Sequence, residues 1–125
     1  MAGSKGSKYY NVFLNYELKL RDNEGNVILN HEGFELLTMI HSLNSIVSAS
    51  NRMGISYRKA WGIINKVEKK LGFPLVIKQR GGADGGHTSL SPEGLQLLDG
   101  YNGLTEQFEV SVKDITQKFF QKINK

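Results

Sequence analysis

Residues 53–91, MGISYRKAWGIINKVEKKLGFPLVIKQRGGADGGHTSLS, decide the fold of this chain. Ser56 is a favourable N-cap, and Gly54 before it can end a preceding helix in a left-handed conformation. We therefore expect a helix that begins at Tyr57 and stops before Gly72. Its apolar residues recur at spacings of four, three and four, which places them on one core-facing stripe: Ala60, Ile64, Val67 and Leu71.

A glycine-rich tip at residues 81–86 separates two short stretches with strand character, PLVIKQR at 74–80 and HTSLS at 87–91. A helix followed by such a two-stranded wing predicts a winged helix-turn-helix. Glycines permit positive φ and a close approach of the backbone to another surface, so the tip can lie along a phosphate backbone or in a minor groove. The alternative is a loose surface hairpin loop.

The sequence around the helix is strongly basic. Residues 51–80 contain eight Lys or Arg residues and one acid, Glu68, whereas the whole chain of 125 residues has a net charge of +4. The side of the helix away from the core stripe carries Tyr57, Arg58, Lys59, Ile63, Lys66 and Lys70. A local positive field of this kind favours a polyanionic partner.

Two further helices are expected before this one. Residues 31–43 have a broad apolar face, and Ser45 can cap a second, short helix over 46–53. With the helix from Tyr57 they make a helix-turn-helix of conventional lengths. Ser45 and Ser48 can donate to a phosphate at the start of the second helix or serve simply as caps, and both interpretations stay open.

A β-hairpin is predicted in front of the helices. Residues 9–21 alternate well enough to form a strand, above all over VFLNYELKL at 12–20. Turn residues follow at 22–26, and residues 27–29 would return antiparallel. We expect this hairpin to have a structural role.

These motifs together resemble the N-terminal DNA-binding domain of the molybdate-dependent transcriptional regulators of the bacterial ModE type, whose winged helix is akin to that of LysR-type regulators. The resemblance covers roughly residues 17–104. The matching positions are Gly54, Ser56, Tyr57, Ala60, Trp61, Pro74, Leu75, Val76, Gly81, Gly82, Gly85, Gly86, Leu90 and Gly94. His87 stands where a third wing glycine is usual, and Ser91 replaces a threonine after Leu90. Neither change touches the fold, although His87 can alter how the wing meets DNA.

The last part of the chain is predicted to form a long helix. Ser91 can cap it, with proline at the first helical position and an acid in the first turn. An apolar seam then steps by three or four residues: Tyr101, Leu104, Phe108, Val112, Ile115, Phe119 and Ile123. Because the seam is more apolar than so small a domain can cover, we expect it to pair with a second copy. The alternative is that the helix packs on its own domain.

The length of the chain allows one compact domain and an appendage. We expect a disordered N-terminal tail over 1–8, a winged helix-turn-helix DNA-binding domain over 9–90 and a dimerisation helix over 91–125. The expected fold class is α+β, mostly α: a winged helix-turn-helix with an N-terminal β-hairpin and a long C-terminal dimerisation helix.

The chain lacks the residues that several classes of function need. The chain has no cysteine for disulfides or thiolate metal sites, and no apolar run approaches the ~20 residues of a membrane span. With no apolar signal core at the N-terminus, we expect a cytoplasmic protein. The GGADGG tip lacks the Gly-Lys-Ser/Thr ending of a nucleotide-binding loop, and His31, His41 and His87 stand apart. We therefore expect neither an enzyme nor a bound metal or cofactor.

The expected partner is double-stranded DNA, bound by a homodimer as a transcriptional regulator. A two-fold axis can place two recognition helices, residues 56–71, in successive major grooves about 34 Å apart, with each wing, 77–88, on the adjacent backbone or minor groove. Arg58 is the candidate for a bidentate guanine contact, and Trp61 for a half-buried packing anchor. The predicted DNA-binding residues are Ser45, Ser48, Ser56, Tyr57, Arg58, Lys59, Lys66, Lys78, Arg80, Gly81, Gly82, Gly85, Gly86 and His87.

Two other functions compete with this one. In the first, the basic face serves an acidic protein partner and the C-terminal helix joins a different chain. In the second, the protein is a nonspecific, architectural DNA binder. The resemblance also implies a ligand, since full-length ModE-type members sense molybdate through C-terminal oxyanion-binding domains. This chain ends soon after the long helix, so molybdate is not expected to bind it.

Overall fold

The computed structural model describes residues 8–79 and 87–124. The chain divides into two compact units, one formed by Leu18–Tyr101 and the other by Met1–Glu17 together with Asn102–Lys125. The first unit contains the helix-turn-helix and the wing. The second unit consists, in its described part, of an N-terminal segment and about the last two thirds of the long C-terminal helix.

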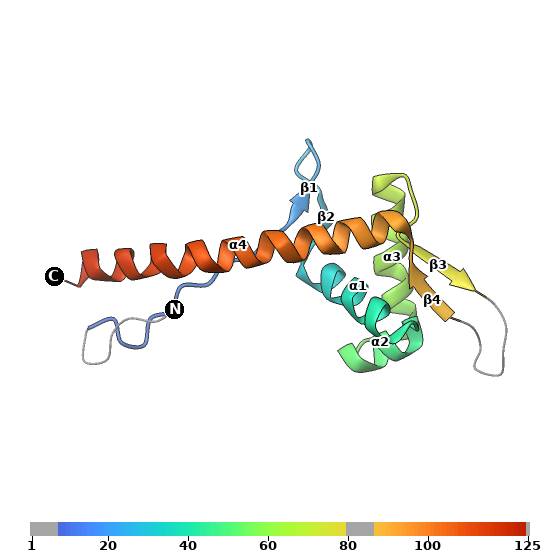
Figure 1. Cartoon of the computed structure of the whole chain (residues 1–125), viewed down its shortest axis with the longest axis horizontal. Helices are drawn as coiled ribbons and strands as arrows, with labels where there is room; N and C mark the ends of the chain where they lie inside the picture. The colour runs from blue at the N-terminus through green and yellow to red at the C-terminus, as the bar shows by residue number, and fades with distance from the viewer. Residues whose placement is uncertain (1–7, 80–86, 125) are drawn as a thin grey trace. The chain divides into compact units, whose positions relative to one another are not determined.

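Helices make up most of the described chain (Figure 1). The helices are α1 (His31–Leu43), α2 (Ile46–Met53), α3 (Tyr57–Leu71) and α4 (Pro92–Ile123). Two small antiparallel sheets accompany them: β1 (Leu20–Arg21) pairs with β2 (Val27–Leu29), and β3 (Val76–Gln79) pairs with β4 (His87–Leu90). The predicted winged helix-turn-helix, with a hairpin before it and a long helix after it, is confirmed.

Local sequence signals set the helix boundaries. Ser45 and Ser56 cap α2 and α3, because each hydroxyl accepts a hydrogen bond of 3.0 Å from the backbone N–H three residues on. Gly54 and Gly72 end α2 and α3 with φ of 69° and 86°, in the left-handed region that glycine tolerates best. Ser91 caps α4 as expected, since its hydroxyl accepts from the backbone N–H of Gly94 at 3.0 Å.

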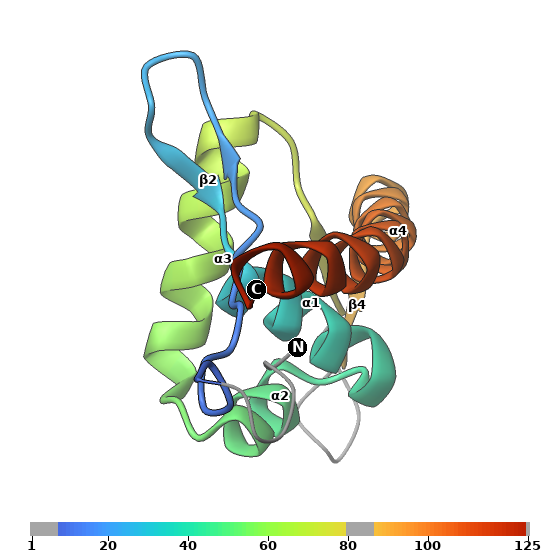
Figure 2. The same ribbon diagram turned by 90° about the vertical axis from the view of Figure 1, so that its left-hand side faces the viewer.

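The core of the first unit lies around α1. Leu36, Leu37 and Ile40 are completely buried, and they pack with the α3 residues Ala60 and Ile64. The rest of the buried apolar core is Leu29, Phe34, Ile46, Ala49, Val67, Leu75, Val76, Leu90 and Leu98. Figure 2 shows α3 along one side of this unit, with α2 near its N-terminal end and the β1–β2 hairpin beside its C-terminal half. The core therefore fixes one face of α3 and leaves the opposite face to solvent.

The first predicted strand is wrong over most of its length. Only Leu20–Arg21 is strand, and the described residues before it, 8–19, contain a single bridge at Phe13. The partner strand β2 is three residues long, so the ladder holds only two residue pairs. Within the described residues the wing strands are Val76–Gln79 and His87–Leu90, so Pro74, Leu75 and Ser91 lie outside them.

The alternating segment packs against a helix instead. Within the second unit, the Tyr9 ring lies 6.5 Å from the Phe120 ring, and the Tyr16 ring stacks 6.5 Å from that of Phe108. Thr116 and Phe120 are buried. The aromatic side chains of this segment are therefore used in contacts with α4 and not in a sheet. None of the described helices is long and apolar enough to cross a membrane.

Candidate nucleic-acid interface

The two faces of α3 have opposite character. Its core stripe is buried at Ala60, Ile64 and Val67 and half-buried at Leu71. The opposite face repeats the same spacing of four, three and four residues with exposed side chains, and we call it the outward stripe: Arg58, Gly62, Asn65 and Lys69. The outward stripe is therefore the part of α3 that can meet a partner most directly.

The three predicted base-contacting residues at the start of α3 differ in their surroundings. Among the described residues, the Arg58 side chain has no hydrogen-bond or ion-pair partner. The Lys59 ammonium lies 3.3 Å from a carboxylate oxygen of Glu32, a solvent-exposed ion pair of small net stability. Tyr57 packs edge-on to Trp61, with ring centroids 6.3 Å apart. Arg58 is thus the side chain whose donors are most available.

The wing is attached to α3 by the one acid of the basic region. A carboxylate oxygen of Glu68 accepts hydrogen bonds from the backbone N–H groups of Leu75, at 2.6 Å, and Val76, at 3.2 Å. The Ser91 hydroxyl donates to the carbonyl of Pro74 at 2.8 Å. A Cβ at Gly94 would lie 2.2 Å from the Leu75 carbonyl oxygen, so only glycine fits there without a shift. These contacts fix the base of the wing relative to the recognition helix.

A second attachment joins the wing to the turn between α1 and α2. The backbone N–H of Thr88 donates to the carbonyl of Asn44 at 3.1 Å, and Asn44 has a left-handed φ of 52°. In the wing register Lys78 pairs with Thr88, and the Lys78 ammonium lies 5.3 Å from the centre of the Trp61 ring. Trp61 is half-buried against the core, as predicted.

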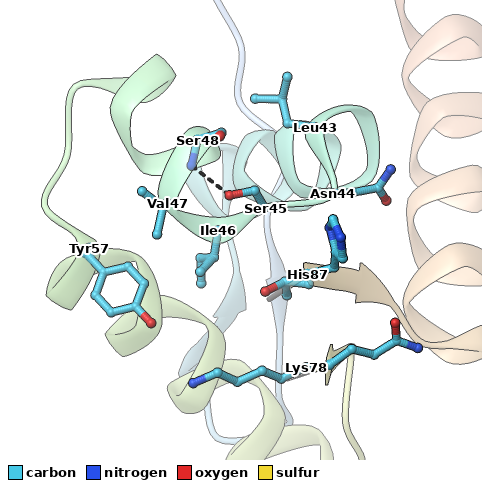
Figure 3. A pocket seen from close by; sticks show the side chains of 11 residues that line it. Leu43, Asn44, Ser45, Ile46, Val47, Ser48, Tyr57, Lys78 and His87 are labelled. Carbon is cyan, nitrogen blue, oxygen red and sulfur yellow. Dashed lines mark hydrogen bonds between the residues drawn. The ribbon is translucent and has the colours of Figure 1, made fainter. Parts of the chain in front are cut away.

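A pocket of about 370 Å³ lies where these elements meet (Figure 3). Its walls are the turn and first residues of α2, from Leu43 to Ser48, together with Tyr57, Lys78, Gln79, His87 and Thr88. None of the described residues that line it is acidic. The first backbone N–H groups of a helix lack intrahelical partners and carry partial positive charge, and here the Lys78 ammonium reinforces that charge. The pocket therefore suits a phosphate or another anion.

The predicted DNA-binding residues separate into three groups. The pocket brings together Ser45, Ser48, Tyr57, Lys78 and His87. Ser56, Arg58, Lys59 and Lys66 are exposed on α3 or at its cap, outside the pocket. Arg80, Gly81, Gly82, Gly85 and Gly86 lie outside the described residues.

Three members of the outward stripe were not predicted from the sequence. Gly62, Asn65 and Lys69 are exposed between and beyond the predicted contacts. Their signal is the same spacing that located the core stripe, moved to the other side of the helix. A search for charged residues alone does not find this stripe, because two of these three residues are uncharged. No group of three or more His, Cys, Asp or Glu residues in the described part of the chain could hold a metal ion.

Comparison with protein-family models finds no match. In sequence, 93 residues, or 74% of this chain, are 30% identical to the molybdenum-pterin-binding protein MopB of Rhodobacter capsulatus. A further comparison gives 26% identity over 97 residues, or 78% of the chain, with the molybdenum transport protein ModE of Azotobacter vinelandii. The chain spans about a third of the length of these relatives, 33% and 36%. The predicted resemblance to ModE-type proteins is confirmed.

Solved structures with the same fold are more distant in sequence. BenM_DBD in complex with benA site 1 DNA has a TM-score of 0.56 and 17% identity, over 71% of this chain and 98% of that chain. ArgP from Mycobacterium tuberculosis gives 0.54 and 15%, over 70% of this chain and 31% of that one. VV2_1132, a LysR family transcriptional regulator, gives 0.54 and 19%, over 72% and 29%. At these identities the likeness defines the fold alone, a winged helix.

Proposed function

We propose that this ModE-like winged-helix chain is a transcriptional regulator that binds double-stranded DNA sequence-specifically as a homodimer. The observation that carries the proposal is the pocket between the α2 N-terminus, the start of α3 and the wing, beside the exposed outward stripe of α3. A phosphate in the pocket would set the position of α3, and the outward stripe would then read base edges. A winged-helix structure solved with bound DNA is the supporting analogy.

In the proposed complex α3 enters the major groove. Arg58 forms the bidentate guanine contact, because its guanidinium is exposed in the first turn of α3. Tyr57 and Lys59 contact base edges or flanking phosphates, and Lys66 contacts a phosphate. Phosphate contacts in the pocket come from Ser45, Ser48, Lys78 and His87. The wing, with residues 80–86, lies on the adjacent backbone or in the minor groove.

The dimer is proposed from the apolar surface of α4. Four residues of the predicted seam are well exposed in one chain: Leu104 at 40%, Phe108 at 41%, Ile115 at 59% and Phe119 at 48%. From residue 104 to residue 119 the stripe is about 22 Å long, at about 1.5 Å per residue. Burying it would contribute roughly 25 cal/mol for each Å² of apolar surface. A second copy offers the same stripe in a two-fold arrangement and doubles the phosphate contacts.

The proposed division by function is a DNA-binding domain over 9–90 and a dimerisation helix over 91–125. It differs from the two compact units, because residues 9–17 pack on α4. Function comes from binding, without a catalytic step, and the proposed place of action is the cytoplasm, where bacterial DNA lies. The chain spans only about a third of the length of its sequence relatives, so the link to molybdenum in their names is not proposed for it.

A selection from a random duplex library at near-physiological salt tests the proposal. We expect an enriched inverted repeat, whose half-site spacing measures the distance between the two recognition helices. Retention without enrichment would favour an architectural DNA binder. If no duplex is retained, the protein-interaction alternative replaces the proposed function.

A further inference from the structure

Gly62 lies in the middle of the exposed face of the recognition helix. It follows Arg58 by one turn and precedes Asn65 by one turn, so all three belong to the outward stripe. A glycine in the interior of an exposed helix lowers helix stability relative to alanine. Its presence there therefore calls for a physical reason.

The free chain does not supply that reason. Gly62 is helical, with no positive φ. Apart from its two chain neighbours and the backbone of its own helical turns, no described heavy atom lies within 4 Å of the place that a Cβ would take. Gly33 and Gly94 are different, since a Cβ there would meet a Leu29 side-chain atom at 2.3 Å and the Leu75 carbonyl oxygen at 2.2 Å. An alanine at position 62 would fit the unbound protein.

We infer that the backbone of α3 at Gly62 packs directly against a base edge in the major groove, and that Gly62 is a specificity-determining residue. The inference rests on the proposed function. The side chains one turn before and one turn after are Arg and Asn, whose donors and acceptors match guanine and adenine edges. A Cβ at position 62 would hold the helix away from the groove floor by about one carbon–carbon bond, about 1.5 Å. Arg58 and Asn65 would then lose their reach together.

The contact is with bases and not with phosphates, because Gly62 brings no charge and no side-chain donor. Loss of this base contact should therefore weaken binding to the selected site and leave binding to random duplexes unchanged. A residue with a merely structural role would alter both in parallel. The difference between the two affinities is thus the informative readout.

The test compares Gly62→Ala with Gly103→Ala in the full chain. Gly103 is a matched control: it is an exposed glycine within α4, off the predicted seam. As at Gly62, an added Cβ would meet no described heavy atom within 4 Å outside its chain neighbours and its own helix backbone. Both variants should melt about 2–6 °C above the wild type, because each replaces a helical glycine by alanine. A rise in both shows that any loss of binding does not come from unfolding.

We expect Gly62→Ala to lose about tenfold or more in affinity for the selected site, with an unchanged affinity for random duplex and an unchanged salt slope. Gly103→Ala should bind both as the wild type does. Suppose that the wild type is selective, but Gly62→Ala binds the selected site equally well or loses affinity for random and selected duplexes equally. The inference is then overturned while the proposed function stands. If the wild type selects no sequence, the proposed function fails and the inference falls with it.

Discussion

Helix α3 and the last two thirds of α4 differ in whether their apolar side is buried. The apolar stripe of α3 is buried in its own unit, and its free face carries Arg58, Lys66 and Lys69 with no exposed acid among the described residues of the helix. In α4, residues 102–123 carry three acids and three bases, and much of their apolar seam is exposed. A polyanion suits the first surface and an apolar partner the second. The two surfaces therefore suit different kinds of partner.

The largest expected effect comes from charging the α4 seam. Phe108→Glu with Ile115→Glu should convert the proposed dimer to a monomer, because burying carboxylates in an apolar interface costs at least roughly 3 kcal/mol. Light scattering measures the mass. Val110→Glu is the matched control, since Val110 is an exposed apolar residue of α4 outside the seam, and it should leave the mass unchanged. A double variant that remains dimeric would move the interface away from the seam.

The next largest effect is expected in stability, from Glu68, the one acid in α3. Glu68→Ala should lower the free energy of unfolding by about 1.5–3 kcal/mol, because two backbone N–H groups at the wing base lose a charged acceptor. Urea unfolding measures the change. Lys69→Ala, at the next position and fully on the exposed side, should stay within about 0.5 kcal/mol of the wild type. Equal stability of the two variants would mean that Glu68 does not hold the wing.

A loss of similar size is expected in DNA affinity when the proposed base contact of α3 is removed. Arg58→Ala should cost about 1–3 kcal/mol at the selected duplex and relax the preference at one base pair. Lys118→Ala removes a charge from α4, where Lys118 pairs with Asp114 at 3.0 Å, and should not change the preference. An unaltered base preference in Arg58→Ala would remove this residue from the readout.

The smallest effect is expected at the wing. Replacing Lys78 and Arg80 by Ala should weaken all duplexes alike, by about 1 kcal/mol or less for each residue. The slope of log affinity against log salt should become shallower by about 0.9 for each phosphate that the variant no longer neutralises. Titrations at several salt concentrations measure it. A slope equal to that of the wild type would mean that these residues do not touch the DNA backbone.

Sequence reasoning predicted several residues that the structure brings together, but it did not predict the contacts that hold them in place. It named Ser45, Tyr57, Lys78 and His87 separately, and the structure brings them to one pocket. It missed Gly62 and Asn65, because neither is charged and the prediction followed charge along the helix. It did not foresee the role of Glu68, since the two N–H groups that it accepts from lie seven and eight residues further on, beyond a helix end.

The sequence by itself determined the helices of the DNA-binding part. The caps Ser45, Ser56 and Ser91 and the stop signals Gly54 and Gly72 act through hydrogen bonds and φ angles within a few residues, so they can be read locally. Only the tertiary structure decided what residues 9–17 pack against and which side of α4 stays exposed. An alternating apolar pattern states that one side must be covered, but which surface covers it depends on contacts between residues far apart in the chain.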